Sequence, residues 1–505
     1  MTEATALPPP PADAAASAAT WAPLRRASAN GVVINLGSQV VRLTIQLVYQ
    51  VALARCLAPQ DFGVVAMAWP VLAFVSLFAD FGLTQATVQR QDITQAELSF
   101  IYWANGSAGL LFAVATIAVS PLVARFYGVA EAGPVTAALG ALFLVNGLFS
   151  QHLALLNRRL AFARLAAVDL AGAAFGAIAG LAAASAGAGF WAIVIGQAAT
   201  SVVSAPLAWV LTRWRPDAPR RIAGARRLVA FGADMTAYGF MNYFARNLDN
   251  VLIGRFLGET PLGLYDRAYK LLPLPLTQIT VPVGKVALPL LARTRDQPER
   301  YRRAYLRMLE IIMALTYPGV VFAVCASHEL ILVALGPRWI DVAPIFAMLG
   351  LGALLAPISY STGWLFITQE RTREMRNWGF ASSVGYVLSF IAGLPWGPLG
   401  VAASYIAVGA LQAPVLWRLA TRSGPVGLRD LIMTVAPCIA AAGVAAAETL
   451  SLQRLLPPGI VALAVMMVAA YVTFAIALAC APSGRAILRE TLGESLRLAR
   501  SLRTA

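Results

Sequence analysis

The sequence predicts an all-α polytopic membrane protein, and three observations carry this prediction. Apolar stretches of about twenty residues, the length that crosses the hydrocarbon core of a bilayer, recur from residue 30 to residue 481. Only 12% of the residues are charged, whereas roughly a quarter are charged in a soluble protein. The basic residues gather in alternate loops, as they do in proteins that insert with one orientation.

Turn signals and charges divide the apolar part of the chain into about fourteen expected transmembrane helices. Each expected helix is a run of mostly apolar residues that ends where Gly, Pro or charged residues cluster. An even number of spans places both termini on the same side of the membrane. The expected helices cover residues 30–54, 62–89, 98–120, 134–156, 165–186, 188–211, 228–253, 263–291, 309–334, 342–368, 377–394, 398–417, 431–450 and 458–481.

The basic residues outside these helices are divided very unequally between the two sides of the membrane. The side that holds the termini carries 29 of them, and the opposite side carries five. Cytoplasmic loops collect Lys and Arg, so both termini are expected in the cytoplasm. Because topology explains the net charge of +15, we expect no nucleic acid among the partners. The five on the opposite side are Arg55, Arg125, Arg255, Arg338 and Arg454.

Two terminal segments and one linker complete the expected domain organisation. The Pro- and Ala-rich start lacks the basic beginning of a signal peptide and is expected to be a disordered cytoplasmic tail. The last segment places leucines among arginines, which predicts a basic amphipathic tail that binds anionic membrane lipids. The expected segments are the tail 1–29, a six-helix lobe 30–211, a basic linker 212–227, a second six-helix lobe 228–421, two further helices in 422–481 and the basic tail 482–505.

The sequence does not point to an enzyme. No loop on the outer side exceeds roughly fifteen residues, which leaves no room there for the carboxylates of a membrane glycosyltransferase or polymerase. No nucleotide-binding motif is present. The four cysteines form no CxxC pair and have no His at ligand spacing. We therefore expect no catalytic residue, no cofactor and no metal site.

One phrase occurs twice in the chain. "ARCLAPQDFGVVAMA" at 54–68 and "GRFLGETPLGLYDRA" at 254–268 align without a gap at an offset of 200 residues. Arg, Leu, Gly and Ala recur at four matched positions. Four identities in fifteen positions are weak evidence for an internal repeat in a chain rich in Ala, Gly and Leu. The neighbouring polar residues provide a second test of the repeat.

The polar residues of the first and seventh expected helices match at the same offset. In the first helix they fall within an arc of about 100 degrees, which predicts a face turned to protein or water. Positions 42, 46, 49 and 50 match 242, 246, 249 and 250, which predicts two copies of one six-helix unit around a central cavity. The polar residues are Asn35, Gln39, Arg42, Gln46, Tyr49 and Gln50 in the first helix, and Tyr238, Asn242, Arg246, Asp249 and Asn250 in the seventh.

Charged residues inside the expected helices are functional candidates, because each is unfavourable by about 2.5–3.5 kcal/mol at mid-bilayer. Arg42 has no acidic residue within four positions, which favours a functional role. Two structural interpretations stay open. Arg246 and Asp249 can form a local ion pair. Arg267, Lys270 and Asp266 can lie near the outer membrane surface, where long side chains extend their charged ends into water. The basic residues are Arg42, Arg246, Arg267, Lys270 and Lys285, and the acidic ones include Asp80, Asp169, Asp234, Asp249, Asp266 and Glu329.

Two stretches carry a resemblance to a known family. They begin "RCLAPQDFG" at Arg55 and "NLDNVLIGRFLGETPLGLYDRA" at Asn247. The chain from about residue 30 to 420 resembles the polysaccharide-transporter branch of the multidrug/oligosaccharidyl-lipid/polysaccharide exporter superfamily. Within it, the chain is similar to lipopolysaccharide-biosynthesis exporters of the Wzx and colanic-acid type. The shared phrases describe loop geometry and identify no substrate.

The resemblance implies two six-helix lobes that form a V in the bacterial inner membrane. Such proteins move an undecaprenyl-diphosphate-linked oligosaccharide, an O-antigen or exopolysaccharide repeat unit, from the cytoplasmic to the periplasmic leaflet. It also implies a monomer that works with a polysaccharide polymerase and glycosyltransferases. The expected substrate-binding residues are Arg42, Arg246, Asn35, Gln39, Gln46, Asn242, Lys270 and Lys285, and the expected ion-coupling residues are Asp249, Asp234 and Asp80.

Two alternatives remain open at this point. A cation-coupled drug antiporter of the same superfamily would be expected to have a more apolar, acid-lined cavity and twelve spans. A membrane scaffold that transports nothing would have no reason to keep Arg42 inside the bilayer. The polar faces favour the flippase over both.

Overall fold

The computed structural model describes residues 37–79, 92–219, 247–271 and 273–480, together with positions 84, 87, 88, 90, 243, 484 and 485. Every regular element in these residues is a helix, which confirms the all-α prediction. Ten helical segments of the described part are long and apolar enough to cross a membrane. The chain is therefore a multi-pass membrane protein, and the count of fourteen helices stays a prediction.

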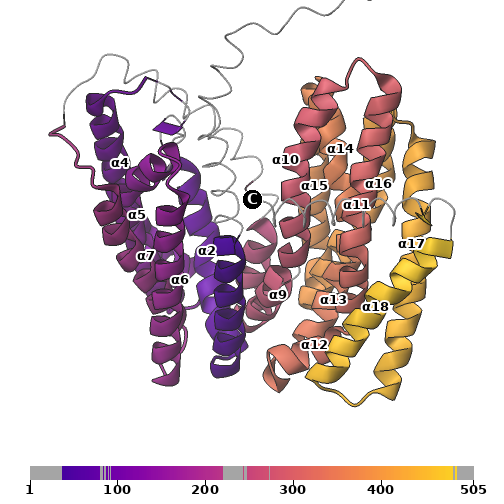
Figure 1. Cartoon of the computed structure of the whole chain (residues 1–505). Helices are drawn as coiled ribbons and strands as arrows, with labels where there is room; N and C mark the ends of the chain where they lie inside the picture. Colours follow the sequence, from indigo (N-terminus) through magenta and orange to yellow (C-terminus); the bar gives the residue numbers. More distant parts are fainter. Residues whose placement is uncertain are drawn as a thin grey trace, which may run out of the picture.

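The helices form two groups, which we call the N-lobe and the C-lobe (Figure 1). The groups stand apart at their upper ends and meet at their lower ends, where α2 and α9 lie side by side (Figure 1). The N-lobe consists of the helix 37–56, α2 (Pro59–Ala79), α4 (Gln95–Tyr127), α5 (Ala132–Arg158), α6 (Phe162–Ser185) and α7 (Trp191–Thr212).

The C-lobe starts with the helix 247–257 and continues to α16. Two more long helices pack on its outer side through α11 (Figure 1). Its elements are α9 (Glu259–Leu271), α10 (Pro273–Arg293), α11 (Pro298–Cys325), α12 (Ser327–Ala334), η1 (Pro337–Trp339), α13 (Val342–Ala353), α14 (Ala356–Thr368), α15 (Thr372–Gly393), η2 (Leu394–Trp396) and α16 (Gly397–Thr421), followed by α17 (Leu428–Leu455) and α18 (Ile460–Cys480).

The expected range 263–291 falls on α9 and α10, and position 272 between them lies outside the described residues. Two other expected helices are interrupted in the structure: 309–334 falls on α11 and α12, and 342–368 falls on α13 and α14. At the last of these, Pro357 stands in the first turn of α14. Proline has no N–H to continue the hydrogen-bond ladder of α13 and disfavours helical geometry in the residue before it. Composition alone did not reveal these breaks, because both pieces are apolar.

The two copies of the repeated phrase meet at the lower end of the molecule. A Cβ atom on Gly63 would lie 1.8 Å from the carbonyl oxygen of Glu259, and one on Gly263 would lie 1.9 Å from that of Pro59. The pairs 63/263 and 59/259 are both related by the offset of 200 residues. The helices α2 and α9 thus cross about a local pseudo-two-fold axis, and only glycine permits so close an approach.

Arginines of the same phrase also reach across to the opposite lobe. The Arg55 guanidinium donates to the carbonyl oxygens of Val333 and Ala334, the latter at 3.2 Å, at the end of α12. The Arg255 guanidinium lies 5.8 Å from the ring centre of Phe126 near the end of α4. Each lobe therefore contributes one arginine of the phrase that lies against a helix end of the other.

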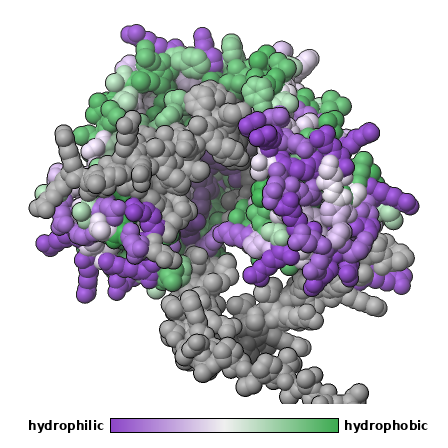
Figure 2. All heavy atoms as spheres, turned by 90° about the horizontal axis from the view of Figure 1, so that it is seen from above, coloured by the Kyte–Doolittle hydropathy of each residue, from purple (hydrophilic) through white to green (hydrophobic). Residues whose placement is uncertain are grey.

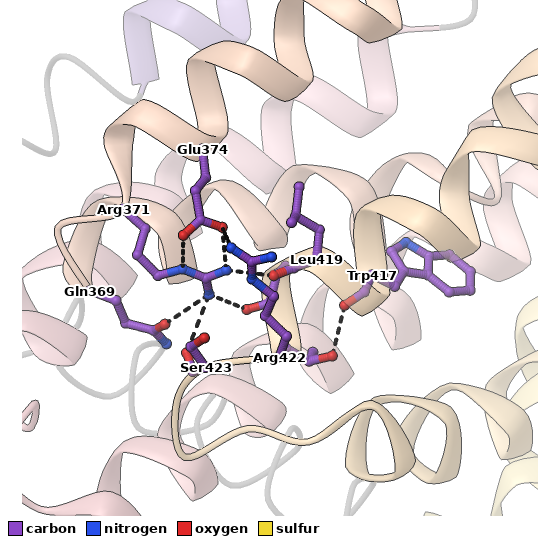
Figure 3. Close-up of polar contacts among 9 residues, drawn as sticks. Gln369, Arg371, Glu374, Trp417, Leu419, Arg422 and Ser423 are labelled. Carbon is purple, nitrogen blue, oxygen red and sulfur yellow. Dashed lines mark hydrogen bonds and ion pairs between the residues drawn. The ribbon is translucent and has the colours of Figure 1, made fainter.

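At the upper end, matching turns join α5 to α6 and α14 to α15. Leu160 and Glu370 both have a positive φ, 52° and 59°, which is rare for residues other than glycine. An arginine next to each turn donates to carbonyl oxygens at the end of a neighbouring helix. Arg159 binds Thr212 at 2.9 Å, and Arg371 binds Leu419 at 2.6 Å and Ala420 at 2.8 Å (Figure 3). These contacts fix the ends of α7 and α16.

Candidate functional site

A cavity of about 370 Å³ lies between the lobes. Its walls come from the helix 37–56, α2, α6 and α7 of the N-lobe and from α9 of the C-lobe. Viewed from the upper end, the molecule has a hollow between the two lobes with hydrophilic residues inside it (Figure 2). A polar cavity between two membrane lobes is a site where a polar substrate can cross.

The polar face of the first helix turns toward this cavity. Arg42, Gln46, Tyr49 and Gln50 line it. Gln39 is half-buried and does not belong to the lining, and Asn35 lies outside the described residues. The sequence analysis predicted that the six polar residues share one face, because residues three and four apart on a helix lie on the same side. Four of the six line the cavity.

Tyr49 is fixed by a slot that two glycines provide. A Cβ atom on Gly180 of α6 would lie 2.1 Å from the Tyr49 hydroxyl, and one on Gly196 of α7 would lie 2.2 Å from it. Earlier in α6, Gly172 and Gly176 make room for Ser204 and Thr200 in the same way. Small residues four apart on a membrane helix are typical of close helix packing. That spacing was a signal in the sequence that could have found this wall.

The α9 wall carries a charged cluster of Asp266, Arg267 and Lys270. Asp266 accepts from Arg267 at 3.0 Å and from Lys270 at 2.8 Å. Arg267 also donates to Gln50 across the cavity, and its guanidinium lies 4.2 Å from the ring centre of Phe62. Asp266 and Arg267 are only 4% and 7% exposed. Tertiary packing therefore encloses both side chains.

Arg42 and Asp169 are the other charged residues of the lining. They belong to the helix 37–56 and to α6, and they attract each other electrostatically. Within the described part of the chain, however, Arg42 forms no ion pair or hydrogen bond. The described lining thus has three cations, Arg42, Arg267 and Lys270, and two carboxylates. Its charge excess is positive.

Several predicted residues lie elsewhere. Asp249 is 4% exposed and accepts from the Tyr265 hydroxyl at 3.0 Å and from the backbone N–H of Asn250 at 2.8 Å. It is therefore part of the C-lobe interior and not of the lining. Lys285 is exposed on α10 and does not line the cavity. Asp80, Asp234, Asn242 and Arg246 lie outside the described residues.

The sequence analysis missed several polar and aromatic residues of the wall. They lie on α2, which is apolar around Trp69, and on α7, where Gln197, Thr200 and Ser204 are spaced by three and four residues on one face, a signal that the sequence analysis did not use. Only the packing of the two lobes shows which side of each helix faces the cavity. These residues are Trp69, Gln197, Thr200 and Ser204.

Comparisons with known proteins connect this architecture to a family. A family model described as "Polysaccharide biosynthesis protein" matches residues 52–344, more than half of the chain. The chain belongs to this polysaccharide biosynthesis family. The match includes both copies of the repeated phrase and the α9 cluster.

Relatives in this family carry names from polysaccharide pathways. Teichuronic acid biosynthesis protein TuaB of Bacillus subtilis is 28% identical over 330 residues, covering 65% of this chain and 68% of that protein. Lipopolysaccharide biosynthesis protein WzxC of Escherichia coli is 24% identical over 354 residues, covering 69% and 71%. Succinoglycan biosynthesis transport protein ExoT of Rhizobium meliloti is 25% identical over 340 residues, covering 66% and 68%.

Solved structures show the same fold. A lipid II flippase MurJ in an inward closed conformation superposes with a TM-score of 0.70 over 89% of this chain and 98% of that one, at 12% identity. An inward-facing multidrug resistance MATE transporter has a TM-score of 0.58 over 79% and 98%, at 14% identity. At these identities the likeness concerns the fold alone.

Proposed function

We propose that this protein is a flippase that moves a lipid-linked oligosaccharide across the bacterial inner membrane by alternating access. The observation that carries the proposal is the cavity between the lobes, whose described lining holds three cations against two carboxylates. An undecaprenyl diphosphate head group brings about two negative charges. Arg binds phosphate oxygens in a bidentate manner, so Arg42 and Arg267 suit that group.

The arrangement of the lobes gives the proposed direction of loading. The lower end is closed by the crossing of α2 and α9, while the hollow opens between the upper ends (Figure 2). The upper end holds the turns with Arg158, Arg159 and Arg371, so on the positive-inside rule we propose that this end faces the cytoplasm. The substrate would enter there, and separation of α2 from α9 would release it to the other leaflet.

The names of the relatives support the class of substrate. Proteins called lipopolysaccharide, teichuronic acid and succinoglycan biosynthesis proteins cover about two thirds of this chain. We propose an O-antigen or exopolysaccharide repeat unit as the glycan, and a polymerase and glycosyltransferases of the same pathway as partners. The protein would catalyse no covalent reaction. Asp249, with Asp80 and Asp234, remains proposed for ion coupling.

A strain lacking this gene tests the proposal. We expect loss of surface polysaccharide and accumulation of its lipid-linked precursor in the inner leaflet, both restored by the wild-type gene. Drug sensitivity should not change. Normal polysaccharide together with increased drug sensitivity would contradict the flippase and favour the antiporter.

A further inference from the structure

A smaller cavity of about 210 Å³ adjoins the central one inside the N-lobe. Residues of α2, α5 and α7 line it. Trp69 of α2 and Gln197 of α7 belong to the linings of both cavities, so these two side chains stand at the boundary between them. A cavity of this size suits one ring of a glycan and not a whole repeat unit.

Trp69 is placed unusually for a tryptophan in a membrane helix. The preceding residues 62–68 of α2 are all buried, whereas Trp69 is 37% exposed and lines both cavities. In the described part of the chain its indole N–H has no hydrogen-bond partner. An aromatic ring that faces a polar cavity offers an apolar surface together with a hydrogen-bond donor.

Amide side chains with unused hydrogen-bonding capacity flank this ring. Gln197 of α7 and Asn146 of α5 are exposed to the cavity and have no hydrogen-bond partner among the described residues. Amides that serve the packing of the lobes are bonded instead: Gln151 pairs with Thr87, and Gln412 with Ser382. The two unbonded amides therefore serve something other than the packing.

These groups have the chemistry that binds a sugar. A sugar ring has an apolar C–H face that stacks on an aromatic side chain, and its hydroxyls both donate and accept hydrogen bonds, as amides do. Resting on the flippase function proposed above, we propose that Trp69, Gln197 and Asn146 form a subsite for the sugar attached directly to the diphosphate.

The position of Lys270 identifies which sugar of the glycan occupies the subsite. Its ammonium group lies 5.5 Å from the Trp69 ring centre and 2.8 Å from Asp266. A phosphate held by Lys270 and Arg267 would thus have Trp69 within the length of one sugar ring. A sugar further along the chain would lie too far away. Binding of that phosphate draws the flexible Lys270 side chain off the indole face, which the sugar then covers.

Binding measurements on the purified full-length protein in nanodiscs test the subsite. The probes are undecaprenyl diphosphate without a sugar, and undecaprenyl diphosphate carrying one glucose or one galactose. We expect the wild type to bind a sugar-bearing probe more tightly than the bare lipid. Trp69→Ala should weaken binding of that sugar-bearing probe about tenfold and leave the bare lipid unchanged, because only the sugar stacks on the indole.

Further variants separate the subsite from a folding defect. Trp69→Phe keeps an aromatic face and should retain most of the sugar preference, and Gln197→Ala should lose part of it. The matched control is Trp191→Ala, since Trp191 is 36% exposed on the same lobe but lines neither cavity. It should bind all probes as the wild type does.

The outcomes distinguish this subsite from the proposed function. If the wild type binds every probe equally, or if Trp69→Ala weakens all probes to the same degree, the sugar subsite is wrong while the flippase function stands. If the wild type binds none of the probes, the proposed function fails and the subsite fails with it. Selective loss of the sugar-bearing probe supports both.

Discussion

The N-lobe and the C-lobe share a backbone plan but divide the chemistry of the cavity between them. Residues 131–140 and 341–350 show the same order of exposed, half-buried and buried positions, at an offset of 210 residues. Within the described lining, however, α9 of the C-lobe supplies a charged cluster, whereas the N-lobe supplies amides, hydroxyls, an indole and the charges of Arg42 and Asp169. The two lobes thus share a burial pattern in these helices, while their cavity walls differ in chemistry.

Continuity of the matching helices also differs between the lobes. The helix α5 runs unbroken through Gly147, whereas its counterpart is split into α13 and α14 by Pro357, which stands at the matching position. The offset is 200 residues at the α2–α9 crossing and 210 at these helices, so the C-lobe has ten additional residues in between. Symmetry is therefore strictest at the lower end, where the two copies touch each other.

The largest expected effect comes from filling the α2–α9 crossing. Gly63→Ala and Gly263→Ala each place a methyl group within 2 Å of a backbone carbonyl of the other lobe. Overpacking of this kind destabilises by about 1–3 kcal/mol. We expect both variants to lose most polysaccharide export, and to the same degree, in a complementation assay with protein amounts checked by immunoblot.

The control for these variants is Gly379→Ala, because a Cβ atom there meets nothing within 4 Å. It should export normally. Unequal losses for Gly63→Ala and Gly263→Ala would show that the crossing does not act as a symmetric pair.

A smaller loss is expected when the charged cluster of α9 is neutralised. Arg267→Ala leaves Asp266 with Lys270 as its remaining partner, so one buried pair is broken and the protein should be less stable and export less polysaccharide. Asp266→Asn combined with Arg267→Gln removes the buried Asp266–Arg267 pair as a whole and leaves only Lys270, whose side chain is 44% exposed, without its acidic partner. This double variant should restore protein amount but not export. Normal export by the double variant would remove Arg267 from the proposed diphosphate site.

Arg42 provides the corresponding test on the N-lobe wall. Because it forms no ion pair with a described acid, Arg42→Ala should insert at normal levels and still lose most export. Arg42→Lys should keep part of the activity, since the positive charge remains but the paired N–H donors of the guanidinium are lost. Complementation with immunoblotting measures both. Full activity of Arg42→Ala would show that the charge is not needed, and loss of the protein itself would indicate a structural pairing with Asp169.

The smallest expected effect compares the turns at the upper end. Arg371 donates to the backbone of Leu419, Ala420 and Ser423 and is held by Glu374 at 2.8 Å (Figure 3). Arg159 has a single such bond, to Thr212. Hydrogen bonds made by charged groups contribute about 1.5–3 kcal/mol each.

We therefore expect Arg371→Ala to lower the unfolding temperature more than Arg159→Ala does, as followed by thermal unfolding of the purified protein. Export at growth temperature should remain near normal in both variants. An equal shift in the two unfolding temperatures would mean that the additional bonds of Arg371 add no stability.

The sequence by itself determined the membrane class, the helical content and the first polar wall of the cavity. These features depend on local properties, namely the length of apolar runs and the spacing of Arg42, Gln46 and Tyr49 along one helix face. The repeated phrase was also visible, because its two copies keep identical glycines and arginines at a constant offset.

Only the tertiary structure decided what the repeat does and which other residues face the cavity. The role of Gly63 and Gly263 depends on the close backbone contact between α2 and α9, which the sequence does not show. Trp69 lies on a stretch of α2 that is apolar on every side, so only the packing of neighbouring helices shows that it faces the cavities. Likewise, Asp266 and Arg267 are buried because the other lobe covers them, which no periodicity along α9 encodes.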